Sequence, residues 1–370
     1  MPVDIRVLVV DDSAVVRSII ADSIAATPGM TVAGTAGDGR QALELLDALR
    51  PDVITLDVQM PNMDGLATLD AILARRPVPV VMVSSLTRLG ATTTLDALER
   101  GAVDYLAKPD YGAKTRSALR EDLPRKIRLA AGTDVRRILQ IRQQRKQRRA
   151  EQARHMPAAR SNATSYPSDL AGLADRCIAI GISTGGPPAL ACLFESLRPP
   201  MPPVVVVQHM PPSFTKPLAW RLDSLSELSV REAAPGDALR PNLVLIAPGG
   251  KHLQVRRSGT SVRAVVREGA PVSGHMPSAD VLMKSAAAAF GKNCLGVIMT
   301  GMGHDGAEGC GAIRASGGYV LGQDEATSDV YGMNKVAHVR GNVDRQFALD
   351  DAAAAIARYV RSHWAGPCFV

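Results

Sequence analysis

Short apolar runs alternate with helical patterns along the first third of the chain. Each run is long enough for one strand and is followed by polar residues. Strands that alternate with helices predict right-handed crossovers and a parallel sheet covered by helices on both faces. The predicted strands are residues 6–10, 53–56, 78–83 and 103–107, and two of the helices between them are residues 39–49 and 65–75.

The same alternation returns in the second half of the chain. Four more apolar runs predict a second, doubly wound α/β domain with a mainly parallel sheet. These runs are residues 177–180, 204–207, 243–247 and 295–300. Composition shifts toward basic, proline and serine residues between the two patterns, which is typical of a linker. The expected parts are a first domain over residues 1–125, a linker over 126–168 and a second domain over 169–366.

Charge is distributed unevenly along the chain. The 370 residues carry a net charge of +7, yet residues 136–154 hold eight basic side chains and one acid, which accounts for the whole excess. A chain without a general basic excess is not expected to bind nucleic acid. The basic segment therefore predicts either a solvated helix between the domains or a surface attracted to an acidic partner or an anionic membrane.

Membrane insertion and disulfide bonding are not expected. No apolar run approaches the ~18–20 residues that cross a bilayer. The five cysteines show no spacing typical of a zinc site or a disulfide framework. These features favour a cytoplasmic protein.

Polar residues of compatible chemistry follow four predicted strands of the first domain. The carboxyl ends of parallel strands meet at one edge of a sheet, where ligands bind. Clustered carboxylates keep their charge only beside a cation, and oxygen ligands without histidine suit Mg²⁺. A carboxylate can also attack phosphorus and form an aspartyl phosphate. The residues expected to converge are Asp11, Asp12, Asp57, Ser84 and Lys108.

These motifs resemble a response-regulator receiver domain, which has a flavodoxin-like, five-stranded parallel sheet. The resemblance implies that Asp57 is the phosphoacceptor, that Mg²⁺ is held by Asp11, Asp12 and Asp57, and that a sensor histidine kinase is the phosphodonor. Ser84, Tyr105 and Lys108 occupy the positions of the phosphorylation switch. The matching residues are 7–13, Asp57, 60–65, Ser84, Tyr105 and 108–109.

The pattern Gly-x-Ser-x-Gly at residues 181–185 follows the first strand of the second domain. Glycines on both sides of Ser183 allow a sharp turn that exposes its hydroxyl, and Pro187 favours the start of a helix. A nucleophilic serine and an ordinary phosphate-binding turn both fit this pattern. The absence of a following Gly-Lys-Ser/Thr argues against a nucleoside-triphosphate loop.

A base and an acid for Ser183 follow other predicted strands. His209 and Asp305 come after the strands at 204–207 and 295–300, so both are expected at the edge that holds Ser183. His338 remains an alternative base, because Gly-x-Ser-x-Gly hydrolases usually place the histidine last in the chain. The Thr184 N–H is a candidate oxyanion donor. We expect His252, His275 and His304 to be surface or hydrogen-bonded loop histidines.

Four motifs of the second domain resemble the catalytic domain of the chemotaxis protein-glutamate methylesterases. By position, the resemblance makes Ser183 the nucleophile, His209 the base and Asp305 the orienting acid, with the Met302 N–H available to the oxyanion. It implies hydrolysis of glutamate γ-methyl esters, and deamidation of glutamines, on methyl-accepting chemoreceptors, without a cofactor for the ester chemistry. The matching residues are 180–186, 208–212, 246–249 and 300–306.

The order of the two domains predicts a hydrolase controlled by phosphorylation. One hypothesis is that the unphosphorylated receiver covers the edge that holds Ser183. The alternative function is a response regulator whose second domain only binds a partner protein. A further alternative, output through nucleic acid at the basic segment, predicts binding that weakens steeply with salt.

Overall fold

The computed structural model describes residues 4–85, 87–108, 113–155 and 170–364. Its contacts divide the chain into two compact units, Met1–Gln143 and Gln144–Val370. Within the expected linker, α5 (Ala113–Ala131) ends and α6 (Val135–His155) follows, so the division falls inside α6. Residues 156–169 of that linker lie outside the described residues.

The N-terminal unit contains a five-stranded sheet in the order β2-β1-β3-β4-β5, and every neighbouring pair is parallel. The predicted five-stranded parallel sheet is confirmed. The apolar runs did not mark β2, because this edge strand is only partly buried. The strands are β1 (Ile5–Val10), β2 (Met30–Ala36), β3 (Val53–Asp57), β4 (Val80–Ser84) and β5 (Asp104–Ala107).

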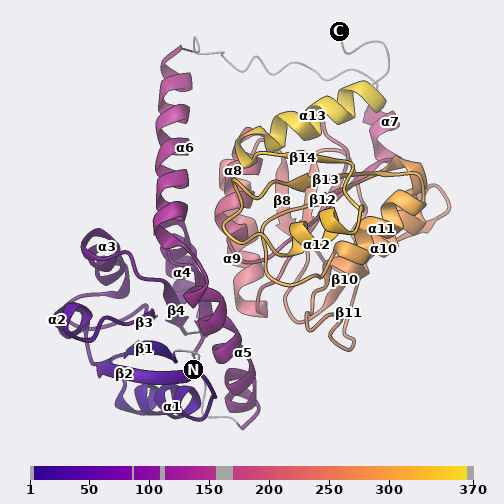
Figure 1. The fold of residues 1–370 in the computed structure, drawn as a ribbon. Helices are drawn as coiled ribbons and strands as arrows, with labels where there is room; N and C mark the ends of the chain where they lie inside the picture. Colours follow the sequence, from indigo (N-terminus) through magenta and orange to yellow (C-terminus); the bar gives the residue numbers. More distant parts are fainter. Residues whose placement is uncertain (1–3, 86, 109–112, 156–169, 365–370) are drawn as a thin grey trace. The chain divides into compact units, whose positions relative to one another are not determined.

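Helices cover both faces of this sheet (Figure 1). Helix α1 packs against α5, whereas α3 contacts both α2 and α4. The first four helices each begin after a residue whose side-chain oxygen accepts a backbone N–H, which satisfies a donor left free at a helix start. These helices and caps are α1 (Ala14–Ala25) after Ser13, α2 (Gly39–Leu49) after Asp38, α3 (Gly65–Arg75) after Asp64 and α4 (Arg88–Arg100) after Thr87.

The C-terminal unit contains a seven-stranded sheet in the order β14-β13-β12-β6-β7-β9-β8, with every neighbouring pair parallel. The predicted mainly parallel sheet is confirmed. The chain leaves β6 toward β7 on one side and later returns to β12 on the other, so β6 lies where the strand order reverses. The strands are β6 (Cys177–Ile182), β7 (Val204–Gln208), β8 (Ser229–Glu232), β9 (Leu243–Ile246), β12 (Cys294–Ile298), β13 (Tyr319–Gln323) and β14 (Arg345–Phe347).

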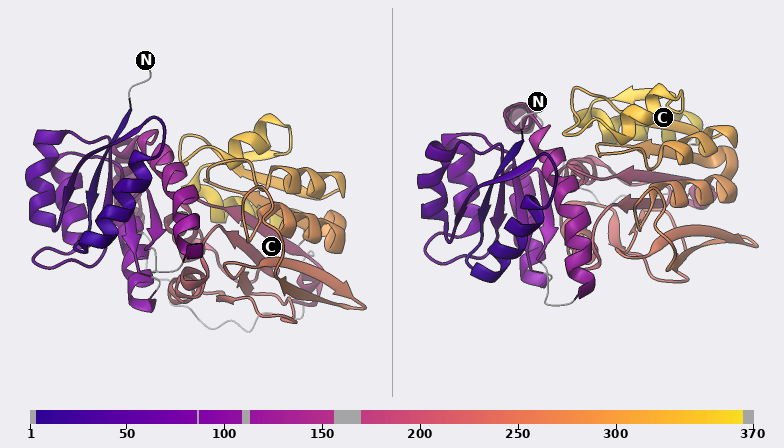
Figure 2. Two further views of the ribbon diagram at one scale, coloured as in Figure 1. Left: turned by 90° about the horizontal axis from the view of Figure 1, so that it is seen from below. Right: turned by 60° about the horizontal axis from the view of Figure 1, so that its bottom comes forward.

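An antiparallel hairpin of β10 (His252–Ser258) and β11 (Ser261–Arg267) packs on α10 and projects away from the sheet, as both views of Figure 2 show. Helix α10 contacts α11, which contacts α12, whereas α8 contacts α9 and α13. No described helix is long and apolar enough to cross a membrane. The helices are α7 (Leu170–Ala174), α8 (Gly186–Ser196), α9 (Pro212–Leu225), α10 (Ala279–Phe290), α11 (Ala307–Ala315), α12 (Met333–Val339), α13 (Ala352–His363) and the short η1 (Gly291–Asn293) and η2 (Leu349–Asp351).

Candidate functional sites

Three carboxylates meet where the strand order of the N-terminal sheet reverses. Val10 in β1 pairs with Leu56 in β3, so the next residues, Asp11 and Asp57, lie side by side. Ligand atoms of Asp11, Asp12 and Asp57 all lie within 4.8 Å of one another. Asp11 and Asp57 are buried, while Asp12 is exposed. Ligands bind at this position in open parallel sheets.

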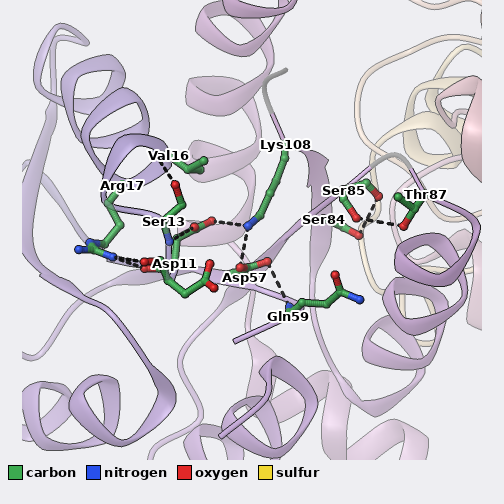
Figure 3. Close-up of polar contacts among 11 residues, drawn as sticks. Asp11, Ser13, Val16, Arg17, Asp57, Gln59, Ser84, Ser85, Thr87 and Lys108 are labelled. Carbon is green, nitrogen blue, oxygen red and sulfur yellow. Dashed lines mark hydrogen bonds and ion pairs between the residues drawn. The ribbon is translucent and has the colours of Figure 1, made fainter. Parts of the chain in front are cut away.

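Lys108 reaches this cluster from the end of β5 (Figure 3). Its Nζ lies 2.6 Å from Asp57 Oδ2 and 3.0 Å from Asp11 Oδ2. The other oxygen of Asp57 accepts the Gln59 N–H at 3.2 Å, and Asp11 Oδ1 accepts the Ser13 N–H at 3.0 Å. Each buried carboxylate therefore has one oxygen that accepts a backbone N–H and one that contacts the ammonium group, through a hydrogen bond for Asp57 and an ion pair for Asp11.

Burial and mutual repulsion disfavour the charged forms of these acids. Burial, aided by the charge of Asp11 and opposed by Lys108, raises the pKa of Asp57 to about 6. Burial also raises the pKa of Asp11. Burial lowers the pKa of Lys108, but the hydrogen bond and charge of Asp57 outweigh it, so the net shift is upward. One ammonium group thus incompletely compensates two buried carboxylates.

These residues fit a magnesium ion. The donor set consists of carboxylate oxygens, which Mg²⁺ prefers, and Mg²⁺ retains waters that an exposed residue such as Asp12 leaves room for. The raised pKa values of Asp11 and Asp57 show that additional positive charge would stabilise the site.

The remaining predicted residues of this unit lie on neighbouring strands. Ser84, at the end of β4, is buried, and its hydroxyl donates to the Ser85 carbonyl at 3.3 Å (Figure 3). Tyr105 in β5 is buried, with Lys126 Nζ 5.0 Å from its ring centroid. Burial, together with the charges of Asp104 and Asp122, raises the Tyr105 pKa well above its ordinary value.

Arg17 was not among the predicted site residues. Its Nη1 donates to the carbonyl oxygens of Asp11 at 2.6 Å and Asp12 at 3.0 Å (Figure 3). Arg17 lies on α1, one helical turn after the Ser13 cap. It therefore holds the turn that presents two of the three carboxylates.

Ser183 lies at the carboxyl end of β6, where the strand order of the C-terminal sheet reverses. Its N–H donates to Thr300 O at 3.0 Å, and its carbonyl accepts Gly186 N–H at 2.8 Å and Gln208 Nε2 at 2.9 Å. The loop after β12 packs closely here, because a Cβ on Gly301 would lie 2.8 Å from Ser183 Cβ. Both neighbouring strands therefore fix the backbone of Ser183, whose side chain is buried.

His209 and Asp305 form a hydrogen-bonded pair beside this position. Ile182 pairs with Gln208, so His209 follows β7 as Ser183 follows β6. His209 Nε2 lies 2.7 Å from Asp305 Oδ2, while the buried Nδ1 has no hydrogen-bond partner in the described part of the chain. Hence no hydrogen bond joins His209 to Ser183 Oγ here. Such bonds are often long before substrate binds.

Asp305 rests on the N-terminus of α10. Its carboxylate accepts the Ser278 hydroxyl at 2.8 Å, the Ala279 N–H at 2.7 Å and the Asp280 N–H at 3.1 Å. Burial opposes ionisation, but the His209 hydrogen bond and charge and the α10 donors outweigh it and lower the Asp305 pKa to about 2. Free N–H groups and the helix dipole favour an anion at such a position. Asp305 is therefore ionised across the physiological pH range.

The other predicted residues of this unit are the two oxyanion candidates, which lie close to Ser183, and the remaining histidines. Thr184 follows Ser183 directly, and Met302 lies in the loop after β12 that packs on Ser183. His338 is exposed near the end of α12. Buried His252 bonds Ala270 O at 3.0 Å and His304 is exposed. His275 is a half-buried loop histidine, and its ring stacks on that of His209, a contact that the sequence did not predict.

Comparisons with known proteins agree with this two-part architecture. Residues 178–356 match the family model of the CheB methylesterase, and residues 7–120 match that of the response regulator receiver domain. A relative from Syntrophotalea carbinolica is 44% identical over 357 residues, which cover 96% of this chain and 98% of the relative. A relative from Pseudomonas aeruginosa is 43% identical and covers 95% of this chain and 96% of the relative.

Both relatives carry the name protein-glutamate methylesterase/protein-glutamine glutaminase. Similarity at this level extends over nearly the whole length of each chain, including both units. The chain therefore belongs to the CheB methylesterase family, in the form that carries a response regulator receiver domain before the methylesterase domain.

Proposed function

We propose that this chain is a phosphorylation-activated serine hydrolase that demethylates glutamate γ-methyl esters and deamidates glutamines on chemoreceptors. The observation that carries the proposal is the 2.7 Å contact between His209 and Asp305 beside Ser183. The names of the relatives supply the substrate class. Chemoreceptor cytoplasmic helices as substrates imply that the enzyme acts in the cytoplasm.

The hydrogen bond between His209 and Asp305 supports His209 as the base. Asp305, with a pKa of about 2, is ionised and only accepts hydrogen bonds. Nε2 of His209 therefore carries the proton of their hydrogen bond, and Nδ1 of the neutral ring holds the free lone pair. Nδ1 is the atom that accepts a proton from Ser183 Oγ.

Acylation begins when Ser183 Oγ attacks the side-chain carbonyl carbon of the substrate. The proton of the hydroxyl passes to His209 Nδ1, and the carbonyl oxygen becomes an oxyanion. As the tetrahedral intermediate collapses, His209 returns the proton to the leaving group, which departs as methanol from an ester or ammonia from an amide. Asp305 stabilises the imidazolium during this step.

The oxyanion requires donors at the end of β6. The backbone N–H groups of Thr184 and Met302 are the candidates, since one follows Ser183 and the other lies in the loop packed against it. One such donor contributes roughly 3–4 kcal/mol to the transition state. Deacylation repeats the steps with water as the nucleophile, and it leaves a glutamate on the receptor. No cofactor is assigned to this chemistry.

The receiver unit supplies the control. Asp57 is the phosphoacceptor, and a sensor histidine kinase is the phosphodonor. Asp11, Asp12 and Asp57 would hold Mg²⁺, which neutralises phosphoryl oxygens when bound. Lys108 exchanges its contact with Asp57 for the phosphoryl group, and Ser84 and Tyr105 respond to that change.

The test is methanol release from methylated chemoreceptor cytoplasmic fragments by the full chain. Wild type is compared with Ser183→Ala, each with and without Mg²⁺ and a small-molecule phosphodonor. We expect Ser183→Ala to lose roughly 10⁴-fold or more in kcat, and phosphodonor with Mg²⁺ to accelerate only the wild type. Equal release by Ser183→Ala would reject the serine mechanism and favour a non-catalytic, protein-binding output domain.

A further inference from the structure

The ring of His275 lies flat against the ring of His209. Their centroids are 3.8 Å apart, and their planes differ by 7°. The His209 side chain is only 7% exposed, and His275 is half-buried. No step of the proposed mechanism uses His275.

A hydrogen-bonded turn holds His275 in this position. Val272 and His275 exchange two backbone hydrogen bonds, of 3.0 and 2.9 Å, across the two residues Ser273 and Gly274. Both of these residues have positive φ angles, 52° and 78°, as in a type I′ turn. The next residue, Met276, accepts the Gly250 N–H at 3.1 Å, which ties the turn to the loop after β9. Hydrogen bonds therefore hold the backbone both at His275 and at the residue that follows it.

The same segment also reaches the partner of His209. Within residues 272–280, the N-cap Ser278 and the first two residues of α10 donate to the Asp305 carboxylate. One stretch of chain thus contacts both the face of the His209 ring and Asp305, the acid that is hydrogen-bonded to Nε2 of that ring. The two contacts restrict different motions of the same ring.

A single hydrogen bond does not fix the plane of an imidazole. The bond from Nε2 to Asp305 restrains one atom of the ring, while rotation about the Cβ–Cγ bond tilts the ring and changes where Nδ1 points. Contact with a parallel ring opposes this rotation, since stacked aromatic groups lose contact area when one of them tilts. The direction of Nδ1 matters because a misplacement of about 1 Å can cost 10²-fold in rate.

We propose that His275 is a positioning residue that holds the plane of His209, and with it the direction in which Nδ1 accepts the Ser183 proton. This proposal rests on the proposed function, because it takes His209 as the base. It assigns to His275 neither a proton transfer nor a substrate contact. What it requires is a flat ring at this position.

The experiment measures kcat and KM for methanol release from methylated chemoreceptor fragments by the full chain, with Mg²⁺ and phosphodonor present. The variants are His275→Ala, His275→Leu and His275→Phe, and His338→Ala is the control because His338 is an exposed histidine of the same unit. We expect kcat to fall roughly 10- to 100-fold in the Ala and Leu variants, with KM nearly unchanged. His275→Phe keeps a flat ring and should remain within about 3-fold of wild type, as should His338→Ala.

Rescue by phenylalanine separates positioning from a general loss of folding. Thermal unfolding of each variant shows whether the C-terminal unit is intact, and phenylalanine and leucine are both large and apolar, so their comparison tests the flat ring rather than hydrophobicity. Wild-type kcat in His275→Ala, or equal kcat in the Phe and Leu variants, would overturn the role of His275. Loss of activity in Ser183→Ala alongside either result would leave the serine mechanism standing, whereas an active Ser183→Ala would reject that mechanism.

Discussion

Asp57 and Asp305 are two carboxylates in similar places with opposite electrostatics. Each is about 1% exposed and lies at the carboxyl edge of a parallel sheet. Yet the pKa of Asp57 is raised to about 6, while that of Asp305 is lowered to about 2. Burial raises the pKa at both sites, so the difference comes from their neighbours.

The neighbours explain what each site is ready to do. Asp305 is surrounded by hydrogen-bond donors, three from the start of α10 and one from His209. Asp57 shares one Lys108 ammonium with a second buried carboxylate. The first arrangement stabilises a permanent anion with donors from the chain itself, which fits the proposed role of Asp305 as the orienting acid. The second gains stability when a cation binds, which fits the proposed role of Asp57 as the phosphoacceptor.

The largest expected effect comes from removing the charge of Asp305. Asp305→Asn retains the shape of the side chain but loses the anion that, in the proposed mechanism, stabilises the His209 imidazolium, so kcat should fall roughly 10³- to 10⁴-fold. Methanol release under phosphodonor saturation measures this loss. Asp175→Asn, at an exposed carboxylate of the same unit, is the control. A loss of less than tenfold would mean that Asp305 does not act through its charge.

The pH dependence of stability should differ between the two units. The Asp57 pKa is raised from 3.8 to about 6, so this group contributes stability below pH 4 that is lost as pH rises through 6. Its ionisation can cost the N-terminal unit up to about 3 kcal/mol at pH 7 in the absence of Mg²⁺. Asp305 behaves oppositely: its lowered pKa contributes stability above pH 4 that is lost as pH falls through 2.

Hydrogen exchange of β1 and β3 peptides in urea, at pH 4.5 and pH 7.5, measures the Asp57 contribution. In a chelator, the N-terminal unit should unfold more readily at pH 7.5 than at pH 4.5, after correction for intrinsic exchange. Mg²⁺ at pH 7.5, or Asp57→Asn, should reduce that difference. If Asp57→Asn showed the same difference in stability between the two pH values, groups other than Asp57 would be responsible for it.

A smaller effect is expected on regulation. Asp57→Asn removes the proposed nucleophile for the phosphoryl group and leaves the C-terminal unit untouched. We expect basal methanol release to stay at the wild-type level and the phosphodonor response, of the order of tenfold, to disappear. Phosphodonor titrations of wild type and Asp57→Asn measure this. Persistent activation in the variant would place the phosphoacceptor elsewhere.

The sequence located residues that directly follow buried strands better than residues that support them. Asp11, Asp57, Ser183 and His209 each follow an apolar run, and parallel pairing alone brings such residues to one edge. Asp305 was also expected at this edge, but it lies farther from its strand, and its hydrogen bonds to the start of α10 correspond to no apolar pattern in the sequence. The edge strand β2 and the hairpin β10–β11 lacked continuous apolar runs for a similar reason, since they are partly exposed.

Supporting contacts depend on the three-dimensional packing of helices and loops. His275 reaches His209 only because a turn 66 residues later in the chain folds back against it. Arg17 looks like an ordinary residue of an amphipathic helix, yet its side chain bonds two carbonyl groups of the preceding turn. Neither contact leaves a periodic pattern in the sequence.

Arg17 provides the finest test of how the cation-dependent site is built. Two effects of Arg17→Ala on Mg²⁺ affinity oppose each other. Loss of a positive charge near Asp11 and Asp12 favours the cation, but this term is screened because Asp12 is exposed and Arg17 is only half-buried. Loss of the two hydrogen bonds, at 2.6 and 3.0 Å, frees the turn that presents both carboxylates.

Each such hydrogen bond is worth about 1 kcal/mol, so we expect the ordering effect to dominate and the Mg²⁺ dissociation constant to rise about 3- to 10-fold. Magnesium titration followed by NMR of the Asp12 and Ser13 amides measures the constant directly. Arg100→Ala is the control, because Arg100 pairs with exposed Asp70 on the same unit. Tighter Mg²⁺ binding in Arg17→Ala would mean that the charge of Arg17 affects Mg²⁺ affinity more than its two hydrogen bonds do. In that case, repulsion between Arg17 and the cation would weaken Mg²⁺ binding in the wild type.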